Sequence, residues 1–158
     1  MTKVPISKTK IETKLATIRD ALMELELIAK LNKTDFSKDK MKFVASEHFL
    51  RRALEAIFDI SGHIISRFPY MPGKRPTTYK EIATAMGEKG IVSQEFAKNS
   101  LLKMAGYRNR MVHYYDEISK EELYGILKNK LDDIDMFAQK IVTLLENPKK
   151  YNLEISDL

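Results

Sequence analysis

The stretch "FLRRALEAIFDISGHIISRF", residues 49–68, decides how the rest of the chain is arranged, because its apolar residues recur at helical spacing. The inward-facing positions of this pattern, including those just upstream, are Phe43, Leu50, Leu54, Ile57, Ser61, Ile64 and Ile65. The spacing predicts one long helix that ends at about Phe68. A single helix has to bury such a face against other elements, so the flanking sequence should supply them.

The sequence on the N-terminal side supplies a second amphipathic helix. Apolar residues spaced three and four apart predict a helix over residues 8–32. Its apolar stripe consists of Ile11, Leu15, Ile18, Leu22, Leu25 and Ala29. The turn formers of "NKTDFSKD", residues 32–39, then break the pattern, with Ser37 as the expected cap of the next helix.

On the C-terminal side, "PYMPGKRP", residues 69–76, stops the long helix, since three prolines and a glycine do not continue it. Thr78 and Glu81 form a capping-box pattern for a short helix, "YKEIATAMGE". Ser93 is the expected cap of a further helix. The predicted buried positions of that helix are Phe96, Leu101, Met104, Ala105 and Val112.

The last long helix opens with a second capping-box pattern, Ser119 and Glu122, and is predicted to continue to Glu146. Its apolar face consists of Leu123, Ile126, Ile134, Phe137, Ile141 and Leu144. No convincing strand alternation is present. The predicted fold is all-α, an up-and-down bundle of four long helices plus one short helix. We expect a single domain over residues 1–146, followed by a frayed or peripheral tail over residues 147–158.

The composition limits the kinds of protein that this chain can be. Of its 158 residues, 44% are apolar and 31% charged, as in an ordinary globular domain. There is no Cys, which excludes disulfides and thiolate metal sites, and three scattered His residues do not make a zinc site. No run of about 18 apolar residues and no signal-peptide core are present, so we expect a cytoplasmic protein without a membrane segment.

Positive charge is concentrated in one region of the chain. The net charge is +5, and residues 63–115 carry nine Lys or Arg against three acids. Such a region attracts nucleic acid, an acidic partner or a phosphorylated ligand, although lysine-rich surfaces often serve solubility alone. Arg51 and Arg52 fit a solvated helix face, and His48 and His63 fit packing or surface positions.

The most polar part of this region is "YRNRMVHYY", residues 107–115, which ends a predicted helix. Asn109 and His113 are four apart, so the amide is positioned to orient the imidazole. The long side chain of Arg108 reaches the same surface, and Tyr115 adds a phenol. A histidine that titrates near neutrality is the usual requirement for general acid or base catalysis.

Arg108, Asn109, His113 and Tyr115 resemble the signature of HEPN-superfamily ribonucleases, in particular the HepT-like toxins. The likeness extends over roughly residues 10–145. The stretches that carry it are "FLRRALEAIFDISGHII", "RPTTYKEIATAM", "GIVSQEFAKNSLLKMAGYRNRMVHYYDEI" and "LYGILKNKLDDIDMFAQKI". The resemblance implies an endoribonuclease toxin that needs no metal or other cofactor. It also implies a homodimer in which two copies of the motif face one cleft, and an antitoxin partner that is a small nucleotidyltransferase of the MntA type.

The resemblance assigns a role to each motif residue. His113 would transfer protons, Arg108 would clamp the phosphate of the RNA, and Asn109 would orient the histidine. Tyr115 would accept AMP from the antitoxin, which silences the toxin. Arg110 is a candidate RNA contact.

Other interpretations of these residues remain open. Lys74 and Arg75 are further RNA-binding candidates, on the charge of their region alone. His113 also fits an ordinary helix end, and Tyr115 fits an interface position. The rival functions are a non-catalytic helical module that presents substrate to a nucleotidyltransferase, and a helical scaffold for an acidic protein.

Overall fold

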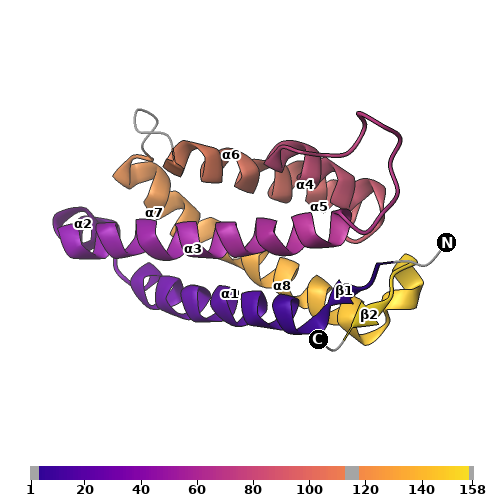
Figure 1. The fold of residues 1–158 in the computed structure, drawn as a ribbon. Helices are drawn as coiled ribbons and strands as arrows, with labels where there is room; N and C mark the ends of the chain where they lie inside the picture. Colours follow the sequence, from indigo (N-terminus) through magenta and orange to yellow (C-terminus); the bar gives the residue numbers. More distant parts are fainter. Residues whose placement is uncertain (1–3, 113–117, 157–158) are drawn as a thin grey trace.

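Helix α3, Lys40–Ile65, runs through the middle of the fold, with α1 packed along one side and α4 and α6 on the other (Figure 1). The computed structural model describes residues 4–112 and 118–156. The remaining α-helices are α1 (Lys8–Ala29), α2 (Lys33–Lys38), α4 (Tyr79–Glu88), α5 (Gln94–Phe96), α6 (Leu102–Val112), α7 (Lys120–Asn129) and α8 (Leu131–Glu146). A π-helical turn, η1 (Ala97–Leu101), joins α5 to α6. A 3₁₀ turn, η2 (Pro148–Tyr151), follows α8.

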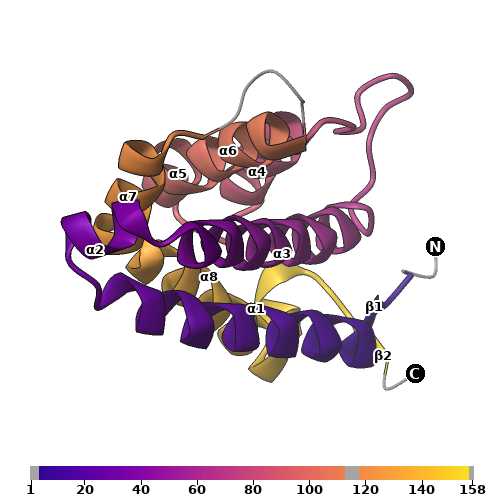
Figure 2. The same cartoon turned by 90° about the vertical axis from the view of Figure 1, so that its left-hand side faces the viewer.

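The helical bundle confirms the all-α prediction. Figure 2, turned by 90° from Figure 1, shows α4 and α6 above α3, and α1 below it with α8 alongside. The buried positions of α3 cover a wide arc because the helix is enclosed on two sides. They are Ser46, Leu50, Ala53, Leu54, Ala56, Ile57, Phe58, Ile60, Ser61, Ile64 and Ile65. A Cβ added at Gly62 would lie 3.7 Å from Ile82 Cδ1 on α4, an ordinary van der Waals distance, so α4 packs directly on this part of α3.

Several predicted helix boundaries are confirmed by hydrogen bonds. The hydroxyls of Thr78, Ser93 and Ser119 accept from the backbone N–H of the residue three positions later, at 3.0 to 3.1 Å. Each cap satisfies a donor that the first helical turn leaves without a partner. The caps at these three helix starts could therefore be predicted from local sequence.

Other boundary predictions were wrong. Residues 33–38 form the extra short helix α2, capped by Asn32, and Asp39 rather than Ser37 caps α3. The carboxylate of Asp39 accepts from Lys42 N–H at 3.1 Å, which fixes the start of α3. Helix α3 ends at Ile65 instead of Phe68, and the next residues form tighter turns.

The predicted last long helix is two helices. Lys130, with φ −120° and ψ −5°, interrupts it between α7 and α8. Neither Gly nor Pro marks this break in the sequence. The change of direction at Lys130 lets α7 pack on α1, α2 and α3 while α8 continues along α1. The predicted burial of Val112 is also wrong, since this side chain is 49% exposed at the end of α6.

Residues 148–156, where we expected a frayed or peripheral tail, make contacts with the rest of the chain at two points. Ile155–Ser156 forms strand β2, which pairs in parallel with Ile6–Ser7, strand β1. Leu153 is buried in the same core as the helices. No pattern of alternation predicts a two-residue strand, so only the tertiary contact reveals it.

His63 of α3 holds the start of α1. Its Nε2 accepts from the backbone N–H of Ser7 at 2.9 Å, and Arg67 Nε donates to the carbonyl of Pro5 at 3.0 Å. Burial, reinforced by the positive charges of Arg67 and Lys10, lowers the pKa of His63 from 6.5 to about 4. The neutral imidazole is the form that accepts this hydrogen bond.

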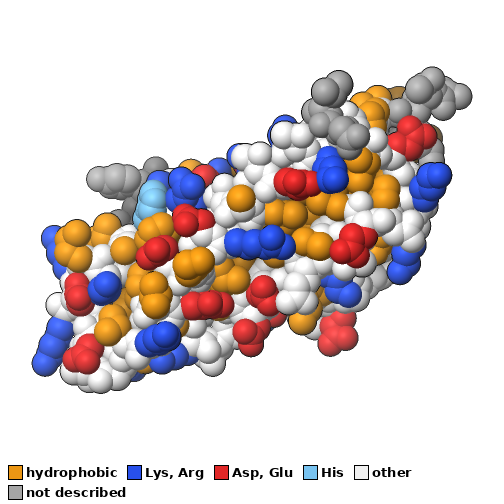
Figure 3. Space-filling view, turned by 90° about the horizontal axis from the view of Figure 1, so that it is seen from below, with side chains coloured by type: hydrophobic (Ala, Val, Ile, Leu, Met, Phe, Trp, Pro, Cys, Tyr) orange, Lys and Arg blue, Asp and Glu red, His pale blue; other side chains and the backbone are white. Residues whose placement is uncertain are grey.

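None of the described helices combines the length and the apolar composition needed to cross a membrane. On the face seen in Figure 3, basic and acidic side chains are interspersed among the hydrophobic ones.

We predict that the His63 contact makes stability depend on pH. Its pKa is lower in the folded chain, so the unfolded chain binds the proton more readily between pH 6.5 and about 4. The stabilisation is complete above pH 6.5 and is lost as pH falls through this window toward the folded pKa. His63→Gln keeps an acceptor but does not titrate, so urea unfolding should show a shallower loss of stability on acidification than in wild type.

His48→Gln is the matched control, because His48 is an exposed histidine of the same helix. It should keep the wild-type pH dependence. Equal slopes for wild type and His63→Gln would contradict this role of His63.

Candidate functional site

The described part of the predicted motif lies on the last two turns of α6. Arg108, Asn109 and Arg110 are partly buried there, where α6 packs against α3 and α4. His113 and Tyr115 lie outside the described residues, so their roles stay predictions from sequence. Asn109 lies on α6, as predicted. Because its expected partner is His113, the orienting role of Asn109 also stays a prediction.

Arg108 is held by side chains from two other helices. Its guanidinium carbon lies 4.5 Å from the ring centre of Tyr79, the first residue of α4. Its Nη2 lies 4.0 Å from Oε1 of Glu55 on α3. Only 21% of the Arg108 side chain is exposed, and its buried Nε has no hydrogen-bond partner among the described residues.

The contact with Tyr79 does more to fix Arg108 than the contact with Glu55. A cation over an aromatic ring contributes on the order of 0.5–2 kcal/mol, rising with burial. The ion pair is at the outer limit of contact, and 43% of the Glu55 side chain is exposed, so it contributes at most roughly 1 kcal/mol. The guanidinium is therefore held mainly by the ring, and Glu55 compensates its charge.

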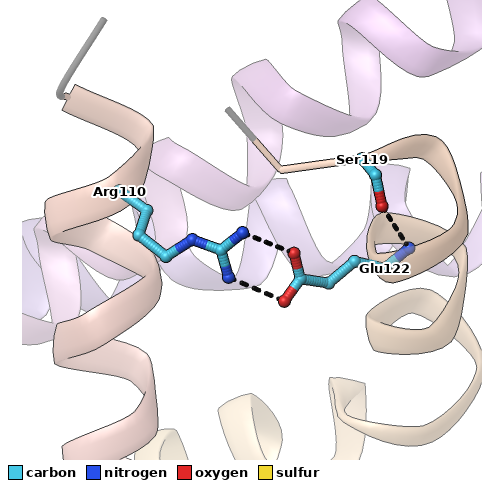
Figure 4. A network of polar contacts seen from close by, with 3 residues as sticks. All are labelled: Arg110, Ser119 and Glu122. Atoms are coloured by element: carbon cyan, nitrogen blue, oxygen red, sulfur yellow. Dashed lines mark hydrogen bonds and ion pairs between the residues drawn. The ribbon is translucent and has the colours of Figure 1, made fainter. Parts of the chain in front are cut away.

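Arg110 joins the end of α6 to the beginning of α7 (Figure 4). Its Nη1 and Nη2 donate to Oε2 and Oε1 of Glu122, both at 2.7 Å. These hydrogen bonds from Arg110 hold the pKa of the Glu122 carboxyl below its ordinary value. Because Glu122 faces Arg110, its side chain is not the reciprocal half of the predicted capping box at Ser119.

This pair changes the interpretation of Arg110. The planar fork that would contact an RNA phosphate is occupied by a carboxylate in the same bidentate geometry. The pair connects the described residues on either side of the segment that contains His113 and Tyr115. The observed contact of Arg110 therefore stabilises the junction of α6 and α7, and its contact with RNA stays a prediction.

Lys74 and Arg75 are not brought into contact with Arg108. Both lie in the exposed loop between α3 and α4, which projects at the opposite end of the bundle from the end of α6 (Figure 1). Arg75 Nη1 donates to the carbonyl of Ser66 at 3.1 Å, and its guanidinium lies 5.7 Å from the ring centre of Tyr70. These contacts hold Arg75 against the end of α3.

Sequence reasoning missed three residues of this site. Tyr79 and Glu55 are far from Arg108 in the chain and meet it only in the folded bundle. Glu122 was predicted only as part of a capping box, and its ion pair with Arg110 was not expected. Of these residues, only Glu55 could have been noticed in the sequence, because it is an acid flanked by apolar positions of the predicted long helix. Within residues 4–112 and 118–156, no three His, Cys, Asp or Glu side chains are grouped to hold a metal ion.

Comparisons with known proteins agree with this architecture. A family model described as ribonuclease HepT-like matches residues 18–141. The tRNA nuclease HepT of Aphanizomenon flos-aquae is 27% identical over 135 residues, which cover 85% of this chain and 89% of that protein. The mRNA nuclease HepT of Shewanella oneidensis is 27% identical over 131 residues, covering 81% and 92%.

A solved structure has the same arrangement of helices. The tri-AMPylated HEPN toxin of Shewanella oneidensis, in complex with an MNT antitoxin, superposes with a TM-score of 0.73 at 25% identity. The match covers 85% of this chain and 97% of that toxin. Together with a family model that spans more than half of the sequence, it shows that this chain belongs to the ribonuclease HepT-like family.

Proposed function

We propose that this chain is the toxin of a toxin–antitoxin pair and that it cleaves RNA endonucleolytically without a metal ion. The observation that carries the proposal is the position of Arg108 on α6. Its guanidinium is held over the ring of Tyr79 on α4, and Arg108 precedes His113 by five residues. Support also comes from family membership and from two relatives named tRNA nuclease and mRNA nuclease.

The proposed reaction is an attack of the ribose 2′-OH on the adjacent phosphorus. A base removes the 2′-OH proton, the 2′-oxygen bonds to phosphorus, and the bond from phosphorus to the 5′-oxygen breaks. An acid then protonates the leaving 5′-oxygen, so that the products are a 2′,3′-cyclic phosphate and a 5′-OH. Arg108 stabilises the negative charge that develops on the phosphate oxygens, and His113 transfers a proton.

A homodimer is part of this proposal. One chain supplies one Arg108 and one His113, whereas the reaction moves two protons in opposite directions. Two copies of α6 that face one cleft would supply a second His113 as the other proton carrier. Asn109 orients the imidazole in each copy.

The antitoxin partner that we propose is a small nucleotidyltransferase of the MntA type. It silences the toxin by transferring AMP from ATP to the hydroxyl of Tyr115, with release of pyrophosphate. The attached phosphodiester is negative and competes with RNA for Arg108, while the nucleoside fills space at the cleft. The related toxin from Shewanella oneidensis is AMPylated in its complex with an antitoxin.

We predict that Arg108→Ala and His113→Ala each lower RNA cleavage by roughly 100-fold or more, because each removes a group that acts in the transition state. Far-ultraviolet circular dichroism should be unchanged, and cleavage by wild type should persist in EDTA. Lys98→Ala is the control. It removes an exposed positive charge from η1, the turn before α6, and should cleave RNA at the wild-type rate. Cleavage that requires added magnesium would refute the metal-independent reaction.

The support of Arg108 by Tyr79 gives another prediction. Tyr79→Phe keeps the ring under the guanidinium and should keep kcat, whereas Tyr79→Leu should lower kcat by roughly 5- to 30-fold with a smaller change in KM. Glu55→Gln should lower KM, because one negative charge beside the phosphate is removed.

Asp59→Asn is the matched control for Glu55→Gln. Asp59 lies one turn later on α3, is similarly exposed and pairs with Lys14 at 3.0 Å. An equal change of KM in both variants would mean that Glu55 acts only through net charge.

Coexpression with the cognate nucleotidyltransferase should add AMP to this chain. Intact-mass and peptide mass spectrometry should place the additions at Tyr115, and Tyr115→Phe should remove them while the chain stays toxic. Tyr114→Phe is the control for the neighbouring phenol and should leave the modification unchanged. A Tyr115→Phe chain that is still modified and silenced would show that the acceptor is another residue.

A further inference from the structure

A pocket of about 270 Å³ lies between the first half of α3 and the end of α6. Four of its lining residues come from α3 and one from α6. They are Val44, Glu47, His48, Arg51 and Met111. None of them belongs to the catalytic set proposed above.

The pocket lies close to Arg108 along the contact between α3 and α6. Met111 follows Arg108 by three residues on α6, and Arg51 precedes Glu55 by four on α3. The two helices contact one another and run in opposite directions (Figure 1). The step from Arg108 to Met111 on α6 and the step from Glu55 to Arg51 on α3 therefore lead toward the same end of the bundle. The pocket is therefore about one helical turn, roughly 5 Å, from the contact between Arg108 and Glu55.

The lining residues offer planar and apolar surfaces of the kind that bind bases. Arg51 is exposed and makes no hydrogen bond or ion pair with another described residue, unlike Arg108 and Arg110. The exposed imidazole of His48 lies edge-on to Phe49, with ring centres 5.2 Å apart. Unstacked RNA bases stack on histidine rings and guanidinium planes, and Met111 and Val44 supply apolar contact.

We propose that this pocket binds one unpaired base of the RNA, next to the phosphate that Arg108 holds. The inference rests on the proposed function, which provides the RNA. The volume lies just below the range of about 300–1,000 Å³ for small-molecule sites, which suits one base better than a larger group.

A second copy of the chain is the competing occupant of this pocket. The proposed homodimer places two α6 helices near one another, and Val44 and Val112 are exposed nearby. The composition of the pocket favours RNA, because interface cores are depleted in charged residues whereas this pocket contains Arg51, Glu47 and a histidine. Oligomeric state is therefore measured in the same experiment.

Arg51→Ala and Arg52→Ala form the decisive pair of variants. Both remove one exposed arginine from neighbouring positions of α3, but only Arg51 lines the pocket. The probe is a fluorescent single-stranded 2′-O-methyl RNA, which cannot react through its 2′ position. Binding to the full chain is followed by anisotropy at one salt concentration. Arg51→Ala and His48→Ala should each weaken binding roughly tenfold, whereas Arg52→Ala should change it less than about threefold.

Each other outcome has a defined meaning. Equal losses in Arg51→Ala and Arg52→Ala would reduce the effect to general charge and overturn the base pocket. A changed sedimentation coefficient in Arg51→Ala or His48→Ala would assign the pocket to a subunit contact and also overturn it. A wild type that does not bind the probe overturns it as well, and cleavage of the unmodified RNA then decides separately whether the proposed function holds.

The reverse case is also distinguishable. A wild type that binds the probe but does not cleave the unmodified RNA would remove the proposed function. A persisting difference between Arg51→Ala and Arg52→Ala would then still support the base pocket.

Discussion

The burial of α3 on two sides is the constraint on which the rest of this structure depends. A helix that packs against α1 on one side and α4 and α6 on the other has to be apolar over most of its circumference. The polar exception is Ser61, whose buried hydroxyl donates to the carbonyl of Ile57 at 2.8 Å. The position of α6, and with it the site, follows from this packing.

The site combines a partly buried cation with partial charge compensation. Tyr79 holds the guanidinium of Arg108 without neutralising it, while Glu55 lies at the outer limit of an ion pair. A phosphate therefore meets a cation whose conformational freedom has already been reduced, which lowers the entropic cost of binding. Arg110 serves a different purpose, because Glu122 occupies its fork and ties α6 to α7. Two arginines two positions apart thus have different environments, which their shared residue type does not reveal.

The contacts at the two ends of the chain show how tertiary structure extends a helical bundle. β1 and β2 pair over two residues each, and His63 and Arg67 hold the segment that leads into α1. The same hydrogen bond that fixes Ser7 requires a neutral imidazole, so it couples the stability of this end to pH. This titrating contact belongs to the fold and involves none of the proposed catalytic residues.

The sequence by itself determined the helical class, the caps at Thr78, Ser93 and Ser119, and the motif that identifies the family, because these depend on residues close together in the chain. Only the tertiary structure decided the break at Lys130, which no Gly or Pro announces, and the exposure of Val112, which depends on where neighbouring helices end. The partners of Arg108 were likewise beyond sequence reasoning, since they come from α3 and α4. Local hydrogen bonds and periodicity are encoded over a few residues, whereas contacts between distant residues are set by how whole helices pack.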